Sequence, residues 1–404
     1  MTYEVFEEIC GNNKICIWGC GKYGQTYAYW SLKSADAEIA CYCDSNYVEG
    51  REYHGIPQIR KEELFLLQDI FVFVAIKNIG AQEKVLDELR KHNIQAHVFD
   101  LQTFSTLCSS LEKCRDANVT YKYQSLISDE AYLSMIFEEK LGHKLNLASP
   151  KTFNEKLQWL KIHNRNPYYN KLVDKAEVKN VVARIIGQEY VIPTLGTWMR
   201  FEDIDFEKLP EQYVLKCTHD SGSIAICSDR DNFDIQGAKK KLTKALDTNY
   251  YWLGREWPYK DIKPRILAEE YICSTKYDVL PVYKFFCFEG EPKLIQAIKN
   301  DKTDKETIDY YDISWNRLDI RQNYPNSDVP LERPEQLEKM TELARLLSEG
   351  VPFIRVDFYA FDSKVLFSEF TFFSDCGLEK FYPESVDLRL GDLINIKDAV
   401  SARK

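Results

Sequence analysis

The first hundred residues alternate between short apolar runs and stretches whose apolar residues recur at helical spacing. Strands are expected at residues 14–18, 38–43, 70–76 and 96–99, and helices at residues 25–33 and 82–92. The run at 70–76 (IFVFVAI) is continuously apolar, which is typical of a strand buried on both faces of a parallel sheet. This alternation predicts a parallel α/β domain over residues 1–105.

The chain beyond residue 105 follows a different pattern. Residues 106–125 have no clear hydrophobic period and are interpreted as a linker. Ser128 can cap one expected helix, and Thr152 with Glu155 forms the capping-box pattern of the next. The expected elements are helices at 128–141 and 152–163 and two-stranded patterns at 213–228 and 282–299. Their irregular mixture predicts an α+β domain over residues 126–404.

The overall composition limits the classes of function. A length of 404 residues suggests two or three domains. Hydrophobic residues at 45% and charged residues at 29% are typical of a globular protein. The formal net charge of −10 argues against a surface that neutralises the phosphates of DNA or RNA. No nucleic-acid partner is therefore expected.

Membrane and secretion signals are not evident in the sequence. The first ten residues, MTYEVFEEIC, carry acids where a signal peptide needs a basic region and an apolar core. The longest apolar stretch, residues 64–76, contains Gln68 and Asp69 and is too short to span a bilayer. The 12 cysteines are dispersed without a CxxC pair, which favours buried free thiols over zinc sites or disulfides. We expect a cytoplasmic protein, at most peripheral to a membrane, with no transmembrane segment.

A glycine-rich turn follows the first expected strand. Gly19, Gly21 and Gly24 form the pattern GxGxxG between a strand and a helix, and Asp44 ends the next strand. Such glycines let a diphosphate approach the backbone, and such an acid can accept a hydrogen bond from a ribose. The alternative is a tightly packed turn that binds nothing. The following stretch, CDSNYVEGREYHGIPQI, resembles small Rossmann-like, sugar-nucleotide-binding domains of carbohydrate-modifying enzymes, which implies a UDP-sugar-like ligand rather than NAD.

Charged residues interrupt the apolar elements of the second domain in an ordered series. Lys175 stands at the start of a helix, and Lys216 ends a strand just before the polar loop at 219–223. A lysine beside a Ser/Gly loop can bind phosphates, because the loop also supplies N–H groups. The strand at 266–272 (ILAEEYI) then carries two acids, which cost free energy in an apolar strand unless a cation or donor meets them.

Two expected strands near the C-terminus predict a metal site. Asp357 in FIRVDFY and Glu369 in LFSEFTF lie on neighbouring strands and could hold a Mg²⁺ ion that bridges nucleotide phosphates. Arg355 lies on the same face as Asp357 and could neutralise a transferred phosphoryl group. Each residue alone could be a surface lysine or an edge-strand acid, but five in this order favour an ATP site.

This ordered series resembles the ATP-grasp superfamily and, more narrowly, the TupA-like ATP-grasp family. That family is associated with teichuronopeptide and other surface-polysaccharide biosynthesis. The resemblance covers roughly residues 126–397 and implies an ATP-grasp fold. The motifs that carry it are KTFNEKLQWLKIHNRNP, LVDKAEVKNVVA, LPEQYVLKCTHDSGS, REWPYKDIKPRILAEEYI, YKFFCFEGEPKLI, FIRVDFY and LEKFYPESVDLRLGDLI.

The resemblance implies roles for the matching residues. Lys175 and Lys216 would contact ATP phosphates beside the loop residues Ser221, Gly222 and Ser223. Glu269 would accept a hydrogen bond from the adenine amino group, and the backbone of Glu270, Tyr271 and Ile272 would form the adenine hinge. Lys284 would support the phosphates or the acyl group, and Asp357 and Glu369 would ligate Mg²⁺. Arg355 would face the transferred phosphoryl group. His219 either assists proton transfer from an amine or hydrogen-bonds the backbone of its loop.

The sequence departs from the family pattern in three places. Thr371 stands where an asparagine commonly follows the metal-binding glutamate, and residues 373–377 replace a small Pro/Gly-rich turn. Residues 300–302 (NDK) stand where an arginine is often found. The first departure concerns the number of metal ions, and the other two concern the acceptor substrate.

The chemistry implied by the resemblance uses ATP to convert a carboxylate into an acyl phosphate, from which an amine displaces phosphate. We expect an ATP- and Mg²⁺-dependent ligase that joins an amino compound to a sugar carboxylate in capsule or exopolysaccharide biosynthesis. One alternative is a glycosyltransferase or a sugar-nucleotide-binding protein, and another is an ATP-dependent sugar kinase. Their products differ: ADP with phosphate, UDP, or ADP with a phosphorylated sugar.

Overall fold

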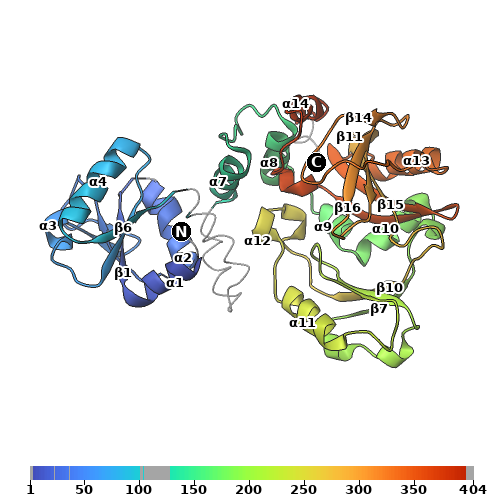
Figure 1. Ribbon diagram of the computed structural model, residues 1–404, viewed down its shortest axis with the longest axis horizontal. Coiled ribbons are helices and arrows are strands. Elements are labelled where there is room, and N and C mark those ends of the chain that lie inside the picture. Colours follow the sequence, from blue (N-terminus) through green and yellow to red (C-terminus); the bar gives the residue numbers. More distant parts are fainter. Residues whose placement is uncertain (1–2, 22, 36, 101–102, 104–127, 397–404) are drawn as a thin grey trace. The chain divides into compact units, whose positions relative to one another are not determined.

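The computed structural model describes residues 3–21, 23–35, 37–100, 103 and 128–396. The chain divides into two compact units, Met1–Lys144 and Leu145–Lys404 (Figure 1). The expected linker at 106–125 lies outside the described residues. No helix in the described part of the chain is both long and apolar enough to cross a membrane.

The first unit is built on a six-stranded sheet with the order β3-β4-β2-β1-β5-β6. The pairings that join β4, β2, β1, β5 and β6 are parallel, and β3 pairs antiparallel with β4. The first strand in the chain, β1, is central, and the later strands are added first on one side of it and then on the other, as in doubly wound α/β domains. The expected parallel α/β domain is thereby confirmed. The strands are β1 (Lys14–Trp18), β2 (Ile39–Cys43), β3 (Glu52–Tyr53), β4 (Ile56–Ile59), β5 (Ile70–Val74) and β6 (Gln95–Val98).

Helices pack on this sheet through alternate strand residues. Cys16 and Val72 belong to a buried cluster that includes Val85 and Leu89 of the amphipathic helix α4. The expected helix at 25–33 is instead a π-helical turn, Tyr23–Ala28, that leads into a short α-helix. The helices of this unit are α1 (Tyr3–Asn12), α2 (Tyr29–Ser34), α3 (Lys61–Leu64), α4 (Ile79–Lys91) and α7 (Asp129–Leu141).

The hairpin of β3 and β4 was not predicted from the sequence. Its connection is His54–Gly55, and both residues have positive φ (56° and 74°). Two consecutive residues with positive φ form the tight turn that matches the twist of a hairpin. Histidine is an uncommon residue at such a position, so the signal was weak.

The second unit begins with helices that dock on its larger sheet. The N–H of Glu155 donates to Thr152 Oγ1 (3.1 Å), and the N–H of Thr152 donates to the Glu155 carboxylate (3.1 Å). The predicted capping box is therefore confirmed. The helices of this unit are α8 (Phe153–His163), α9 (Tyr169–Val173), α10 (Glu177–Ile186), α11 (Ile235–Leu246), α12 (Tyr251–Gly254), α13 (Leu337–Ser348) and α14 (Ser385–Asp392).

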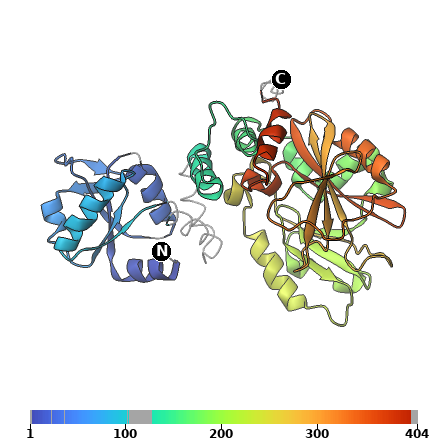
Figure 2. The same cartoon turned by 45° about the horizontal axis from the view of Figure 1, so that its top comes forward.

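Two antiparallel sheets form the body of the second unit (Figures 1 and 2). The smaller has the order β7-β10-β8-β9, and the larger has the order β14-β13-β12-β11-β15-β16. The smaller sheet comprises β7 (Thr194–Trp198), β8 (Tyr213–Cys217), β9 (Ile224–Cys227) and β10 (Ile266–Glu270). The larger comprises β11 (Val282–Phe288), β12 (Glu291–Lys299), β13 (Thr307–Tyr311), β14 (Arg317–Leu318), β15 (Phe353–Phe361) and β16 (Lys364–Thr371).

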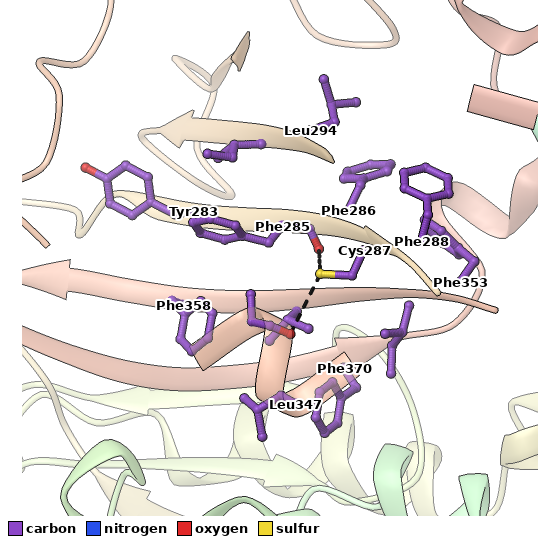
Figure 3. Packing of buried hydrophobic residues seen from close by; sticks show 14 of the residues in the cluster. Tyr283, Phe285, Phe286, Cys287, Phe288, Leu294, Leu347, Phe353, Phe358 and Phe370 are labelled. Atoms are coloured by element: carbon purple, nitrogen blue, oxygen red, sulfur yellow. Dashed lines mark hydrogen bonds between the residues drawn. The ribbon is translucent and has the colours of Figure 1, made fainter. Parts of the chain in front are cut away.

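Each sheet has its own apolar core. Helix α11 covers the smaller sheet, with Leu242 fully buried against it. Aromatic side chains dominate the core of the larger sheet, where Phe285, Phe353 and Phe358 are buried beside helix α13 (Figure 3). Burying one such side chain contributes roughly 1.5–3 kcal/mol. The aromatic core makes the larger sheet a rigid support for the polar residues that its strands carry on the cavity side.

Candidate active site

A cavity of about 320 Å³ in the second unit is lined by residues from both sheets. Among the described residues, its lining includes five cationic side chains and five carboxyl groups. The charged lining residues are Lys175, Lys216, Lys284, Lys302, Arg355, Glu256, Asp301, Asp357, Glu369 and Asp375. The structure thus collects in one cavity most of the ionic residues that the sequence singled out.

One side of the cavity is formed by Lys175 and the loop between β8 and β9. The backbone N–H of Lys175 donates to the carbonyl of Thr218 (3.0 Å), and its ammonium group donates to the carbonyl of Asp220. These bonds hold the start of the loop, whereas Ser221 and Gly222 are exposed and line the cavity. Gly222 has a φ of 92°, which favours glycine. A phosphate here would meet a lysine and the N–H groups of a polar loop.

A buried ion-pair cluster positions Lys216. Glu269 on β10 is 3% exposed, and its two oxygens lie 2.5 Å from the Lys216 ammonium and 3.5 Å from the Lys179 ammonium. Burial opposes ionisation of Glu269, yet the two lysines lower its pKa. Burial lowers the pKa of Lys179 to about 8, although Glu269 opposes the shift. Lys179 was missed in the sequence, although it lies one helical turn after Lys175 in LVDKAEVKNVVA.

The residues expected to hold the adenine do not line this cavity in the structure. Both Glu269 oxygens face lysines, so the carboxylate orients Lys216. Glu270 and Tyr271 line a separate, more open hollow beside Lys208 and Arg230. The backbone N–H of Glu270 donates to the carbonyl of Pro193 (3.1 Å).

Asp357 and Glu369 face each other across β15 and β16. Arg355 donates two hydrogen bonds to Asp357 (2.9 and 2.8 Å) and lies 3.8 Å from Glu369. Lys284 lies 4.0 Å from Asp357. Burial raises the pKa of Asp357 against the effect of these cations. Burial also opposes ionisation of Glu369, but Lys175, Arg355 and Lys284 lower its pKa.

This pair of carboxylates fits a hard divalent cation. Mg²⁺ is commonly bound by one or two carboxylates together with substrate phosphates and water. No group of three or more His, Cys, Asp or Glu side chains that could hold a metal ion occurs in the described part of the chain. Asp357 and Glu369 would therefore hold Mg²⁺ jointly with phosphate oxygens. Arg355 would then have to release at least one oxygen of Asp357.

His219 is placed away from the cavity lining. Its ring is 2% exposed, and Nε2 lies 2.9 Å from the carbonyl of Ala245 and 3.1 Å from that of Thr248. Both partners are backbone carbonyls outside the loop at 219–223, whereas the structural alternative from the sequence placed them within that loop. His219 anchors its loop to the end of helix α11.

Comparison with known proteins decides the family. The sequence profile described as TupA-like ATP-grasp matches residues 155–395, more than half of the chain. The chain belongs to the TupA-like ATP-grasp family. The matched region contains every residue named above for the cavity, so the observed two-sheet unit is an ATP-grasp fold. No curated protein matches the sequence significantly.

Solved structures show only remote likeness. D-alanine–D-alanine ligase from Bacillus anthracis, complexed with ATP, is 13% identical with a TM-score of 0.34, and the match covers 97% of this chain and 98% of that one. The ATP-grasp ligase PsnB, complexed with a phosphomimetic variant of its minimal precursor, Mg and ADP, is 9% identical with a TM-score of 0.34. The match covers 97% of this chain and 98% of PsnB. N5-carboxyaminoimidazole ribonucleotide synthetase from Thermus thermophilus is 11% identical with a TM-score of 0.30. The match covers 89% of this chain and 71% of the synthetase.

The positions where the sequence departs from other ATP-grasp proteins are part of the site. Lys302 lines the cavity, so this chain has a cation in the segment where an arginine is often found. Thr371 accepts a hydrogen bond from Arg355 (3.0 Å), as does Ser374 (3.2 Å). The unusual turn at 373–377 therefore helps to hold Arg355.

In the glycine-rich turn of the first unit, two glycines are packed closely against backbone atoms and the third is not. A Cβ at Gly19 would strike the carbonyl of Ala75, and a Cβ at Gly24 would strike the carbonyl of Gly19. A Cβ at Gly21 would meet no atom of the described residues within 4 Å, its two chain neighbours aside. Asp44 closes the turn, because its carboxylate accepts from the backbone N–H of Cys20 (2.7 Å). Packing thus accounts for Gly19 and Gly24 but not for Gly21.

Proposed function

We propose that the protein is an ATP- and Mg²⁺-dependent carboxylate–amine ligase. The observation that carries this proposal is that one cavity within the ATP-grasp match is lined by Lys175, Lys216 and the Ser221–Ser223 loop, and also by the facing carboxylates Asp357 and Glu369. A nucleotide triphosphate needs both features, because its phosphates are neutralised by cations and bridged by a metal ion.

Each group has a role in this reaction. Lys175, Lys216 and the loop N–H groups would bind the ATP phosphates, and Asp357 and Glu369 would hold Mg²⁺. Lys284 and Arg355 would neutralise the phosphoryl group as it moves to the substrate carboxylate. No protein nucleophile is needed, because catalysis comes from positioning and charge neutralisation.

We further propose that the carboxylate belongs to a sugar and that the product enters capsule or exopolysaccharide biosynthesis in the cytoplasm. The motifs shared with the TupA-like family support this substrate class. In the first unit, Gly21 leaves the backbone accessible to a diphosphate, which supports a role in holding a UDP-sugar-like ligand. The ligase site would then act on a sugar that the same chain recruits.

The experiment is a product analysis with purified protein, Mg-ATP, a panel of uronates (glucuronate, galacturonate, mannuronate) and hydroxylamine as a general nucleophile. The proposal expects ADP, phosphate and a hydroxamate to appear together, only when a uronate is present. A phosphorylated sugar in place of the hydroxamate would identify a kinase instead. Release of UDP from a UDP-sugar without ADP would identify a glycosyltransferase. If no uronate stimulates ADP release, a sugar carboxylate is not the substrate.

A further inference from the structure

A fixed turn forms one corner of the cavity beside Arg355. Asp375 and Cys376 both have left-handed backbone conformations (φ 49° and 55°), which are unfavourable for non-glycine residues. Lys161 and Gln158 stabilise the turn by donating to the carbonyl of Cys376 (2.8 and 3.0 Å). The side chains of Asp375 and Cys376 line the cavity. Surrounding contacts thus hold an unfavourable backbone that directs these side chains to the site.

Glu256 lies under this turn, and no cationic side chain in the described part of the chain forms an ion pair with it. It lines the cavity and is 4% exposed, and the Cys376 thiol donates to its Oε1 (2.9 Å). Within the described residues, the two cations that act on its charge have other partners: Arg355 pairs with Asp357 and Glu369, and Lys161 donates to Gln158 and to the carbonyl of Cys376. Lys161 and Arg355 act on it only from longer range. Burying an ionised carboxylate without a paired cation costs free energy. A cation that enters the cavity and pairs with Glu256 would reduce this free-energy cost.

Burial raises the pKa of Glu256, and Asp375 adds to the shift, while Lys161, Cys376 and Arg355 oppose it. A carboxylate with a raised pKa holds a transferred proton more readily near neutral pH. Glu256 is therefore better suited to accept a proton than an exposed glutamate.

Two tyrosines complete the corner. The rings of Tyr250 and Tyr259 lie edge-to-face with centroids 4.9 Å apart, and both line the cavity. Burial and the nearby charge of Glu256 raise the pKa of both phenols, so both hydroxyls stay neutral. Aromatic faces attract cations. Two carboxylates and two aromatic rings form a surface that favours an ammonium group over an anion.

We infer that Glu256, Asp375, Tyr250 and Tyr259 form the subsite for the amine substrate, which enters as an ammonium ion and loses a proton to Glu256. This inference rests on the proposed ligase function and specifies where its second substrate binds. The corner adjoins Arg355, whose Nη1 donates to Ser374 Oγ (3.2 Å). The nitrogen would therefore be bound next to the residue assigned to the phosphoryl group.

The reaction balances with these groups alone. The ammonium ion transfers one proton to the Glu256 carboxylate, and the freed lone pair attacks the acyl carbon of the acyl phosphate. The C–N bond forms and the C–O bond to phosphate breaks. The second proton of the nitrogen leaves with the phosphate, which departs as HPO₄²⁻. No oxidant, reductant or further reactant is required.

Glu256→Gln tests the inference by comparing two nucleophiles in the full-length protein. With the uronate found active in the product analysis, ADP release is measured with hydroxylamine, which is uncharged at neutral pH, and with ethanolamine, lysine and putrescine, which are cationic. Proton transfer to a positioned side chain raises the reaction rate by about 10²–10⁴-fold. We expect Glu256→Gln to lower kcat/KM for the amines by about 100-fold or more at pH 7, and to lower it for hydroxylamine much less.

The pH dependence separates proton transfer from a structural role. In Glu256→Gln, amine turnover should rise about tenfold per pH unit below the pKa of the amine, because the variant depends on amine that is already neutral. Asp375→Asn should raise KM for the amines several-fold with a smaller effect on kcat, since it removes one of the two charges that bind the ammonium ion. Glu342→Gln, an exposed glutamate on α13, is the matched control and should behave as wild type.

The possible failures are distinguishable. If Glu256→Gln lowers hydroxylamine and amine turnover equally, Glu256 acts through the fold or the ATP site and the inference is wrong. Unchanged amine turnover in Glu256→Gln also overturns the inference. If Glu256→Gln does not fold, an unchanged KM for the amines in Asp375→Asn overturns the inference instead. If the wild-type protein forms no hydroxamate with any uronate, the proposed function itself fails, and the amine subsite is withdrawn with it.

Discussion

The buried cluster of Glu269, Lys216 and Lys179 leads to a quantitative prediction. Glu269→Gln preserves the shape of the side chain but leaves two largely buried ammonium groups without their carboxylate. The side chains of Lys216 and Lys179 are 20% and 12% exposed, so solvent screens them poorly. Removing one partner of a buried pair typically costs about 3–5 kcal/mol of folding stability. We expect Glu269→Gln to lower the free energy of unfolding by about 3 kcal/mol at pH 7.

The expected loss lies at the lower end of that range because Lys179 can release its proton. Its pKa of about 8 is below the ordinary lysine value of 10.5. Between these two values the unfolded chain binds more protons than the folded chain, so Lys179 makes stability rise with pH in this window. At pH 9 Lys179 is already mostly neutral in the wild-type protein. Glu269→Gln then loses only the pair with Lys216, and the loss of stability should be smaller than at pH 7.

The assay is urea unfolding followed by circular dichroism and tryptophan fluorescence at pH 7 and pH 9, with the slope m compared between variants. The matched control is Glu342→Gln, which breaks the exposed pair with Lys339 and should not shift the midpoint measurably. A loss at pH 7 no larger than that of the control would refute the reasoning. If Glu269→Gln loses more stability at pH 9 than at pH 7, proton release by Lys179 does not limit the loss of folding stability.

Four further predictions concern ligands. Asp357→Asn with Glu369→Gln should abolish Mg²⁺-dependent ADP release with an unchanged circular dichroism spectrum, and residual Mg²⁺-dependent turnover would exclude these ligands. Lys216→Ala should weaken ATP binding in calorimetry by about tenfold or more, because a charged hydrogen bond is lost; wild-type affinity would contradict this. Amide exchange in the loop at 219–223 should slow when a Mg-ATP analogue binds, and equal rates with and without it would count against the loop. Gly21→Val should remove UDP-glucose binding by the full-length protein and leave ATP affinity unchanged, whereas a parallel loss of ATP affinity would show that the two sites are not separate.

The sequence by itself determined the secondary structure that carries the site. The continuous apolar run at 70–76 predicted the buried parallel strand, observed as β5 (Ile70–Val74). The period-two pattern also placed Asp357 and Arg355 on one face of a strand, and the structure confirms this by their two hydrogen bonds. These features depend on residues close in the chain, where backbone geometry alone decides which side chains share a face. For the same reason, acids in apolar strands could be recognised as costly before any partner was known.

Only the tertiary structure decided which charges meet. Glu269 faces Lys216 and Lys179 because β10 pairs with β8 and helix α10 packs nearby. Glu256 and Cys376 are 120 residues apart and touch through the turn that follows β16. Contacts of this kind depend on how sheets and helices pack, and a period along one strand contains no information about the strand or turn across the cavity. The sequence therefore predicted that ionic residues gather at a site, and the packing of the two sheets assigned their partners.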